Sequence, residues 1–188
     1  MEVREQRIEV DGVELLFRRP VAPEALIDED AFATDEFLPY WAELWPAALA
    51  LAEALPDVRG LRVVELGCGL GVPSLVAAAR GAEVTATDWA GDAITLLRRN
   101  AEANGLSIRA EARDWRDPWP ERFDLALAAD VLYEQRNVEP VVARLTELAP
   151  RAVVALAGRP YEEEFLRTLA ATGATVEQTD RVVHVSRP

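Results

Sequence analysis

Two patterns of apolar and polar positions mark the first 57 residues. In RIEVDGVELLF (residues 7–17), apolar residues alternate with polar ones on both sides of Asp11-Gly12, which predicts a β-hairpin. A Pro- and acid-rich connection leads to the largely apolar segment FLPYWAELWPAALALAEAL (residues 37–55). Pro46 suits the first turn of a helix, and Pro56 stops that helix. Residues 1–57 are therefore expected to form an N-terminal extension made of a hairpin and a helix.

From Leu61 onward, short apolar runs alternate with segments of helical periodicity, as in repeated βα units. Strands are expected over residues 61–67, 83–88, 107–114, 123–130 and 151–158. Helices are expected over residues 73–81, 92–104, 138–148 and 161–172. Segments 174–178 and 182–186 then form a final antiparallel pair. The pattern predicts a Rossmann-like α/β fold: a mostly parallel sheet with helices on both faces and an antiparallel C-terminal strand.

Composition fits one domain and bears on the partner. The 188 residues are 50% hydrophobic and contain no repeat or flexible linker, so we expect a single domain, 1–188, whose core lies in 58–188. Thirty-three acidic residues against 20 basic ones give a formal charge of −13. This balance argues against a nucleic-acid substrate but would attract a cationic substrate or a basic protein, besides favouring solubility. We expect a monomer.

Location is indicated by three further features. The N-terminus MEVREQRIEV is charged and lacks the apolar centre of a signal peptide, and no apolar run is long enough to span a membrane. Cys68 is the only cysteine, so no intramolecular disulfide forms. We therefore expect a cytoplasmic protein that does not bind membranes.

The segment VVELGCGLGVPSL places glycines 67, 69 and 71 between a strand and a helix. Glycine allows a sharp turn and lets backbone N–H groups approach a ligand. A dinucleotide-binding G-x-G-x-x-G turn would need glycine where Val72 stands, and Glu65 would repel a pyrophosphate. The spacing E-x-G-x-G-x-G instead resembles motif I of class I S-adenosylmethionine-dependent methyltransferases. The resemblance implies that Glu65, Gly67, Gly69 and Gly71 contact that cofactor, whose methionine end offers an ammonium and a sulfonium.

Two more acidic residues end the following strands. Asp88 is placed to accept both ribose hydroxyls of a cofactor, with Trp89 against the adenine, or alternatively to cap the next helix. The resemblance implies that Asp114 accepts from the adenine amino group and that Trp115 supports the ring; alternatively, Asp114 caps a turn. With Glu65, these acids follow three consecutive strands, at the sheet edge where open α/β folds bind ligands.

The segment AADVLYEQRN follows the central strand and lacks the D/N-P-P-Y/F prolines of enzymes that methylate nucleobase amino groups. It resembles the D/E-x-x-Y/F motif of the family 16 lysine methyltransferases. PYWAELWP before motif I is also similar to the matching segment of electron-transfer-flavoprotein β-subunit lysine methyltransferases and their bacterial relatives. The resemblance implies that Trp45 and Ala129 lie near the cofactor and that Asp130 and Tyr133 border the substrate entrance.

These motifs predict an S-adenosylmethionine-dependent N-methyltransferase with a protein lysine as acceptor, S-adenosylhomocysteine as product and no metal. Asp130 would orient the amine or accept its proton, and Tyr133 would shield the site; alternatively, both are structural. The alternative acceptor is a small-molecule amine such as a nicotinamide-like base. Two other classes of protein also stay open: a non-catalytic partner-binding module and a nicotinamide-dependent oxidoreductase. His184, Cys68 and Ser74 are expected to have structural places, and YEEE (residues 161–164) to be a solvated face.

Overall fold

The computed structural model describes residues 2–23 and 39–187, so most of the Pro- and acid-rich connection lies outside the described residues. The chain begins with the predicted hairpin, in which β1 (Val3–Val10) pairs antiparallel with β2 (Val13–Pro20). Asp11 and Gly12 turn the chain with φ of +47° and +76°. Two successive positive φ angles are what a two-residue hairpin turn requires, and Asp-Gly suits them.

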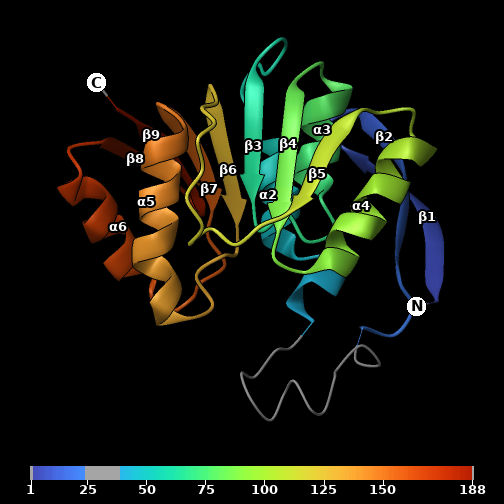
Figure 1. The fold of residues 1–188 in the computed structure, drawn as a ribbon, viewed down its shortest axis with the longest axis horizontal. Helices are drawn as coiled ribbons and strands as arrows, with labels where there is room; N and C mark the ends of the chain where they lie inside the picture. Colours follow the sequence, from blue (N-terminus) through green and yellow to red (C-terminus); the bar gives the residue numbers. More distant parts are fainter. Residues whose placement is uncertain (1, 24–38, 188) are drawn as a thin grey trace.

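The hairpin lies beside helix α4 (Gly91–Ala103), as Figure 1 shows. Two asparagine side chains attach it there, those of Asn100 within α4 and of the C-cap residue Asn104. The Asn104 amide accepts from the Leu16 N–H and donates to the Leu16 carbonyl, both at 2.8 Å. The Asn100 amide does the same for Arg18, at 2.9 and 3.0 Å. A primary amide carries one acceptor and two donors, so each asparagine substitutes for one residue of a neighbouring strand.

The predicted sheet is confirmed. Its seven strands run in the order β5-β4-β3-β6-β7-β9-β8, and β9 is antiparallel to both of its neighbours. The other neighbouring pairs are parallel. The strands are β3 (Arg62–Leu66), β4 (Glu83–Asp88), β5 (Ile108–Ala112), β6 (Leu125–Ala129), β7 (Arg151–Ala155), β8 (Thr175–Thr179) and β9 (Val182–Ser186).

Helices cover both faces of this sheet (Figure 1). Besides α4, they are η2 (Tyr40–Ala42), α2 (Pro46–Glu53), α3 (Val72–Ala79), η3 (Gln135–Asn137), α5 (Val138–Leu148) and α6 (Glu162–Ala171). The helix predicted to begin near Pro46 thus begins there. None of the helices in the described part of the chain is long and apolar enough to cross a bilayer.

Alternate residues of the central strands feed two separate cores. Val63 and Leu127 join the core beneath the hairpin, α2, α3 and α4, whereas Val64 and Ala126 join the core beneath α5 and α6. A strand buried on both faces explains why these segments are almost continuously apolar. The chain leaves β3 toward β4 and β5 and returns on its other side at β6, so a crevice is expected beyond the carboxyl ends of β3 and β6.

Candidate active site

The glycine turn connects β3 to α3 at this crevice and could not be built from larger residues. Gly67, Gly69 and Gly71 have φ of +63°, +50° and +74°. A Cβ on Gly71 would lie 2.4 Å from a methyl group of Leu97, and one on Gly69 would lie 3.2 Å from the Trp41 carbonyl oxygen. Both the backbone conformation and the close packing therefore require glycine at these positions.

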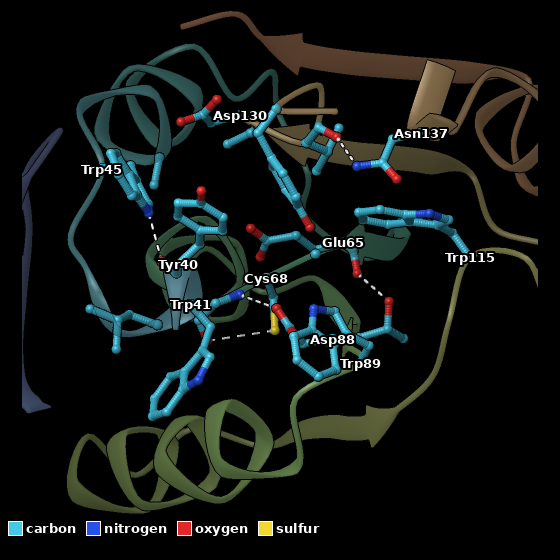
Figure 2. A pocket seen from close by; sticks show the side chains of 18 of the residues that line it. Tyr40, Trp41, Trp45, Glu65, Cys68, Asp88, Trp89, Trp115, Asp130 and Asn137 are labelled. Carbon is cyan, nitrogen blue, oxygen red and sulfur yellow. Dashed lines mark hydrogen bonds between the residues drawn. The ribbon is translucent and has the colours of Figure 1, made fainter. Parts of the chain in front are cut away.

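Asp88 holds the glycine turn against the end of β4. Its Oδ2 accepts from the Gly69 N–H and its Oδ1 from the Ala90 N–H, both at 2.9 Å. Figure 2 shows Asp88 beside Cys68 of the glycine turn. The side chain is buried, and burial raises the pKa of the carboxyl, while these hydrogen bonds oppose the rise. Asp88 thus binds backbone N–H groups next to a helix start, the Trp89 N–H among them, and its side chain also lines the pocket.

Glu65 is the most deeply buried carboxyl group of the pocket, with 1% of its surface exposed. Its Oε2 accepts from the Ser74 N–H at 3.0 Å and also from the Ser74 hydroxyl. Burial raises the pKa of Glu65 from 4.5 to about 8, which exceeds the opposing effect of the Ser74 hydrogen bonds. Ser74 therefore connects β3 to the first turn of α3, a role that the sequence pattern did not indicate.

On one side of the pocket lie Trp89, Asp114 and Trp115. Trp115 is nearly buried against the glycine turn, where a Cβ on Gly67 would come within 3.0 Å of its ring. Asp114 Oδ1 accepts from the Arg116 N–H at 2.8 Å, so the predicted turn cap is present. Trp89 is 46% exposed at the pocket rim. A flat ligand would meet indole surface here, with the Asp114 carboxylate at the edge.

Asp130 lies on the opposite side and forms an ion pair that the motif did not predict. Its φ is +52°, and its N–H continues the sheet by donating to the Ala155 carbonyl at 3.0 Å. The Arg159 guanidinium donates from Nε to Oδ1 and from Nη2 to Oδ2, both at 2.7 Å. The hydrogen bond to Asp130 raises the pKa of Arg159. The two side chains thus form a bidentate pair.

Three aromatic side chains stand beside this pair. The Tyr40 ring lies 5.1 Å from the Tyr133 ring and 6.3 Å from the Trp45 ring, between centroids. Figure 2 shows Tyr40 next to Trp45. Trp45 Nε1 donates to the Tyr40 carbonyl at 2.7 Å, which fixes the indole. Burial raises the pKa of Tyr133, so its hydroxyl stays protonated at physiological pH. An apolar chain ending in a nitrogen would find both aromatic surface and a carboxylate here.

The loop that carries Arg159 is held by Glu162. Its Oε1 accepts from the backbone N–H groups of Ala157, Gly158 and Arg159, at 2.8, 2.7 and 2.9 Å. The expectation that YEEE is a solvated face is wrong for Glu162, because its carboxylate satisfies the loop before α6. A short acidic run in the sequence does not by itself show which of its carboxylates accepts hydrogen bonds from nearby backbone N–H groups.

Every site residue predicted from the sequence lines one pocket with these groups: Trp45, Glu65, Gly67, Gly69, Gly71, Asp88, Trp89, Asp114, Trp115, Ala129, Asp130 and Tyr133. Tyr40, Trp41 and Arg159 line it too. Tyr40 and Trp41 belong to the PYW segment singled out above. Arg159 carried one weak signal, a charged residue between Gly158 and Pro160 just after a strand at the binding edge.

Two residues that were expected to have structural places lie in different surroundings. Cys68 is buried between the motif glycines, and His184 is an exposed residue of β9. The described residues contain no group of three or more His, Cys, Asp and Glu side chains placed to hold a metal ion.

The sheet order and the pocket define a class I methyltransferase fold, and solved structures share it. The T. thermophilus 16S rRNA methyltransferase in complex with AdoMet and guanosine has a TM-score of 0.71 at 23% identity, over 99% of this chain and 51% of that chain. The magnesium protoporphyrin IX methyltransferase of Synechocystis PCC 6803 with bound SAM has a TM-score of 0.67 at 19% identity, over 87% of this chain and 99% of that chain. At these identities the likeness shows the fold.

The chain belongs to the lysine methyltransferase family, whose sequence profile matches residues 40–171. EEF1A lysine methyltransferase 3 of Mus musculus is 32% identical over 138 residues, 68% of this chain and 59% of the relative. Protein N-lysine methyltransferase METTL21A of Danio rerio is 32% identical over 166 residues, 78% and 76% of the two chains. The electron transfer flavoprotein beta subunit lysine methyltransferase of Xenopus laevis is 38% identical over 104 residues, 51% and 42%. The chain spans about three-fifths of the length of two mouse relatives, 59% of EEF1A lysine methyltransferase 3 and 63% of the protein N-lysine methyltransferase METTL21A.

Proposed function

We propose that this protein transfers a methyl group from S-adenosylmethionine to the side-chain amine of a lysine on a protein. Family membership supports the reaction class. One observation carries the proposal for this chain: the motif I residues and the Asp130–Tyr133 motif line a single pocket, so a cofactor and an acceptor would meet in it. Figure 2 shows Trp89 and Trp115 on one side of that pocket and Asp130 and Trp45 on the other.

The residues present fit S-adenosylmethionine. The Asp88 carboxylate, which lines the pocket beside the glycine turn, suits the ribose hydroxyls, and the indoles of Trp89 and Trp115 with the Asp114 carboxylate suit adenine. Glu65 and the glycine turn suit the methionine end, because a buried carboxylate favours an ammonium and disfavours a pyrophosphate. When bound, the cofactor supplies an electrophilic methyl group on a sulfonium.

The acceptor side fits a lysine side chain. A free lysine at pH 7 must lose a proton before it can attack, at a cost of about 4.6 kcal/mol. The chain's part is to position the neutral amine in line with the methyl group. The transfer would replace the carbon–sulfur bond by a carbon–nitrogen bond, leaving a neutral sulfide and a methylammonium, and the proton lost before attack would be the one released overall. Tyr40, Trp45 and Tyr133 would surround the alkyl chain, and Asp130 would accept a hydrogen bond from the amine.

The overall charge supports a basic protein partner. At −13 the chain repels nucleic acid and attracts a lysine-rich surface, so we propose a protein substrate and neither nucleic acid nor membrane. We further propose that the protein acts in the cytoplasm as a monomer. We also propose that it needs no metal, because displacement at a sulfonium needs positioning rather than a Lewis acid.

The test combines binding with product analysis. Calorimetric titration with S-adenosylmethionine, S-adenosylhomocysteine and NADH should give micromolar binding of the two sulfur cofactors and none of NADH. Asp88→Asn should weaken that binding at least tenfold, and Asp92→Asn, the same change on an exposed turn of α4, should not. NADH binding alone would overturn the cofactor assignment.

Labelled methyl groups from the cofactor should then enter the protein fraction of a cell extract, at lysines found by peptide mass spectrometry. Label confined to small molecules would replace the protein acceptor with a free amine. Cofactor binding without any labelled product would indicate a non-catalytic module.

A further inference from the structure

Arg159 is held on three sides, although it lies outside both motifs. Its guanidinium forks onto both oxygens of Asp130, 29 residues away in the chain. Its Cζ lies 5.6 Å from the centroid of the Trp45 ring. Its backbone N–H is one of the three that Glu162 accepts. A guanidinium that is fixed this firmly in the wall of the pocket defines the charge around Asp130.

The two hydrogen bonds from the guanidinium, called the fork below, change the charge that Asp130 presents to an acceptor amine. The Asp130 side chain is only 5% exposed, so without Arg159 it would be a poorly solvated single negative charge. Such a charge would bind an ammonium tightly and thereby favour the protonated, unreactive form of a lysine. Paired with Arg159, the carboxylate has little net charge, yet each oxygen keeps a lone pair for a hydrogen bond.

Resting on the proposed function, we propose that Arg159 is a positioning residue that neutralises and orients Asp130, so that the acceptor amine is held there without its extra proton. Asp130 then acts as a hydrogen-bond acceptor and not as a general base, because taking a proton would break one of its two charge-assisted bonds to Arg159. The proton of the incoming ammonium leaves to water before attack.

Other charged and titratable side chains line the same pocket. They are identical in the wild type and in every variant at residue 159. They are Tyr40, Glu43, Glu65, Cys68, Asp88, Arg113, Asp114, Arg116, Tyr133, Glu134 and Arg136. Because these ionisable groups other than Asp130 are the same in each variant, the informative quantity is the difference between variant and wild type at each pH.

The experiment measures kcat and KM against pH, from 6.5 to 10, with the full chain, saturating S-adenosylmethionine and an acceptor peptide identified by the labelling above. Arg159→Gln should lower kcat about ten- to hundredfold at pH 7, with KM unchanged or lower. The midpoint of its kcat profile should move up by about one to two pH units, so that the loss shrinks toward pH 10. Arg159→Lys, which keeps the charge without the fork, should recover part of the loss.

Arg151→Gln removes an exposed arginine at the start of β7, the opposite end of the strand from the pocket, and should match the wild type. A loss of kcat by the same factor at every pH, or a rise in KM alone, would reduce Arg159 to a structural tie and overturn the proposal. If Arg159→Gln did not fold, Arg159→Lys would decide. A kcat profile of Arg159→Lys identical to that of the wild type would overturn the proposal, because the two hydrogen bonds from the guanidinium to Asp130 would then be dispensable. Failure of the proposed function looks different: the wild type itself would transfer no methyl group to lysine.

Discussion

Replacing Glu65 by glutamine should stabilise the free protein and weaken cofactor binding. The Ser74 N–H and hydroxyl both donate to one oxygen of Glu65, and the single amide oxygen of a glutamine can accept both bonds. The change therefore removes a charge from a buried position and preserves its hydrogen bonds. Stability and binding should respond in opposite directions, which is unusual for a residue inside a core.

The magnitude follows from the raised pKa of Glu65, about 8 in the folded chain against 4.5 ordinarily. Below pH 4.5 the carboxyl is protonated in both the folded and the unfolded chain. The full free energy of unfolding that a neutral side chain gives at this position is therefore present. As the pH rises from 4.5 toward 8, the unfolded chain ionises first and that stability is lost. At pH 7 the fold is weaker by about 3 kcal/mol than with a neutral side chain at this position.

Chemical denaturation at pH 5 and pH 7 gives the required free energies of unfolding. Glu65→Gln should exceed the wild type by about 3 kcal/mol at pH 7 and by about 1 kcal/mol at pH 5. Glu53→Gln, the same change at an exposed position of α2, should have little effect at either pH. A difference between Glu65→Gln and wild type that does not depend on pH, or a less stable variant at pH 7, would refute the reasoning.

Binding supplies the second half of this prediction. An ammonium beside Glu65 favours the carboxylate, so S-adenosylmethionine should bind the wild type at pH 7 with release of about one proton. Calorimetry in two buffers of different ionisation enthalpy measures that number. Glu65→Gln should release none and bind at least tenfold more weakly.

Three further substitutions test single contacts. Gly71→Ala, which drives a Cβ into Leu97 at a positive φ, should destabilise the protein by about 1–3 kcal/mol and abolish S-adenosylmethionine binding in calorimetry, whereas Gly91→Ala, with open space around it, should do neither. Asn104→Ala should lower the free energy of unfolding by about 1–3 kcal/mol, because it leaves strand groups without partners, and should leave cofactor affinity unchanged. Glu162→Ala releases three backbone N–H groups and should lower kcat while cofactor binding persists; a variant with full kcat would show that the loop keeps its shape without this carboxylate.

Local patterns were sufficient to predict the elements and to bring Asp88 and the glycine turn to one pocket, where we propose that the cofactor binds. Asp88 could be placed because it ends a strand whose alternation and length are visible in the sequence, and parallel strands bring their carboxyl ends together. The glycine turn could be placed because positive φ angles and close packing leave glycine as the only suitable residue. Both inferences rest on geometry that a few adjacent residues determine.

The contacts that sequence reasoning missed join distant segments through side chains. Arg159 and Asp130 are 29 residues apart, and Asn104 and Leu16 are 88 apart. No periodicity in the sequence indicates such pairs, because the same charged or amide residue type occurs at positions that face solvent and at positions that face a partner. Ser74 lies closer to Glu65, nine residues away, but its hydroxyl is also indistinguishable from an ordinary helix residue until α3 is packed on β3.

Asn100 and Asn104, at the C-terminal end of α4, also bear on how the hairpin behaves toward other molecules. An unpaired strand edge is a template for another chain, and natural proteins blunt such edges. Here one edge of β2 is taken by β1, and on its other edge the backbone groups of Leu16 and Arg18 are occupied by amides. The outer strand β1 is rich in charge, with VREQRIEV over Val3–Val10. The N-terminal extension is thereby protected from edge-to-edge aggregation while it remains at the surface.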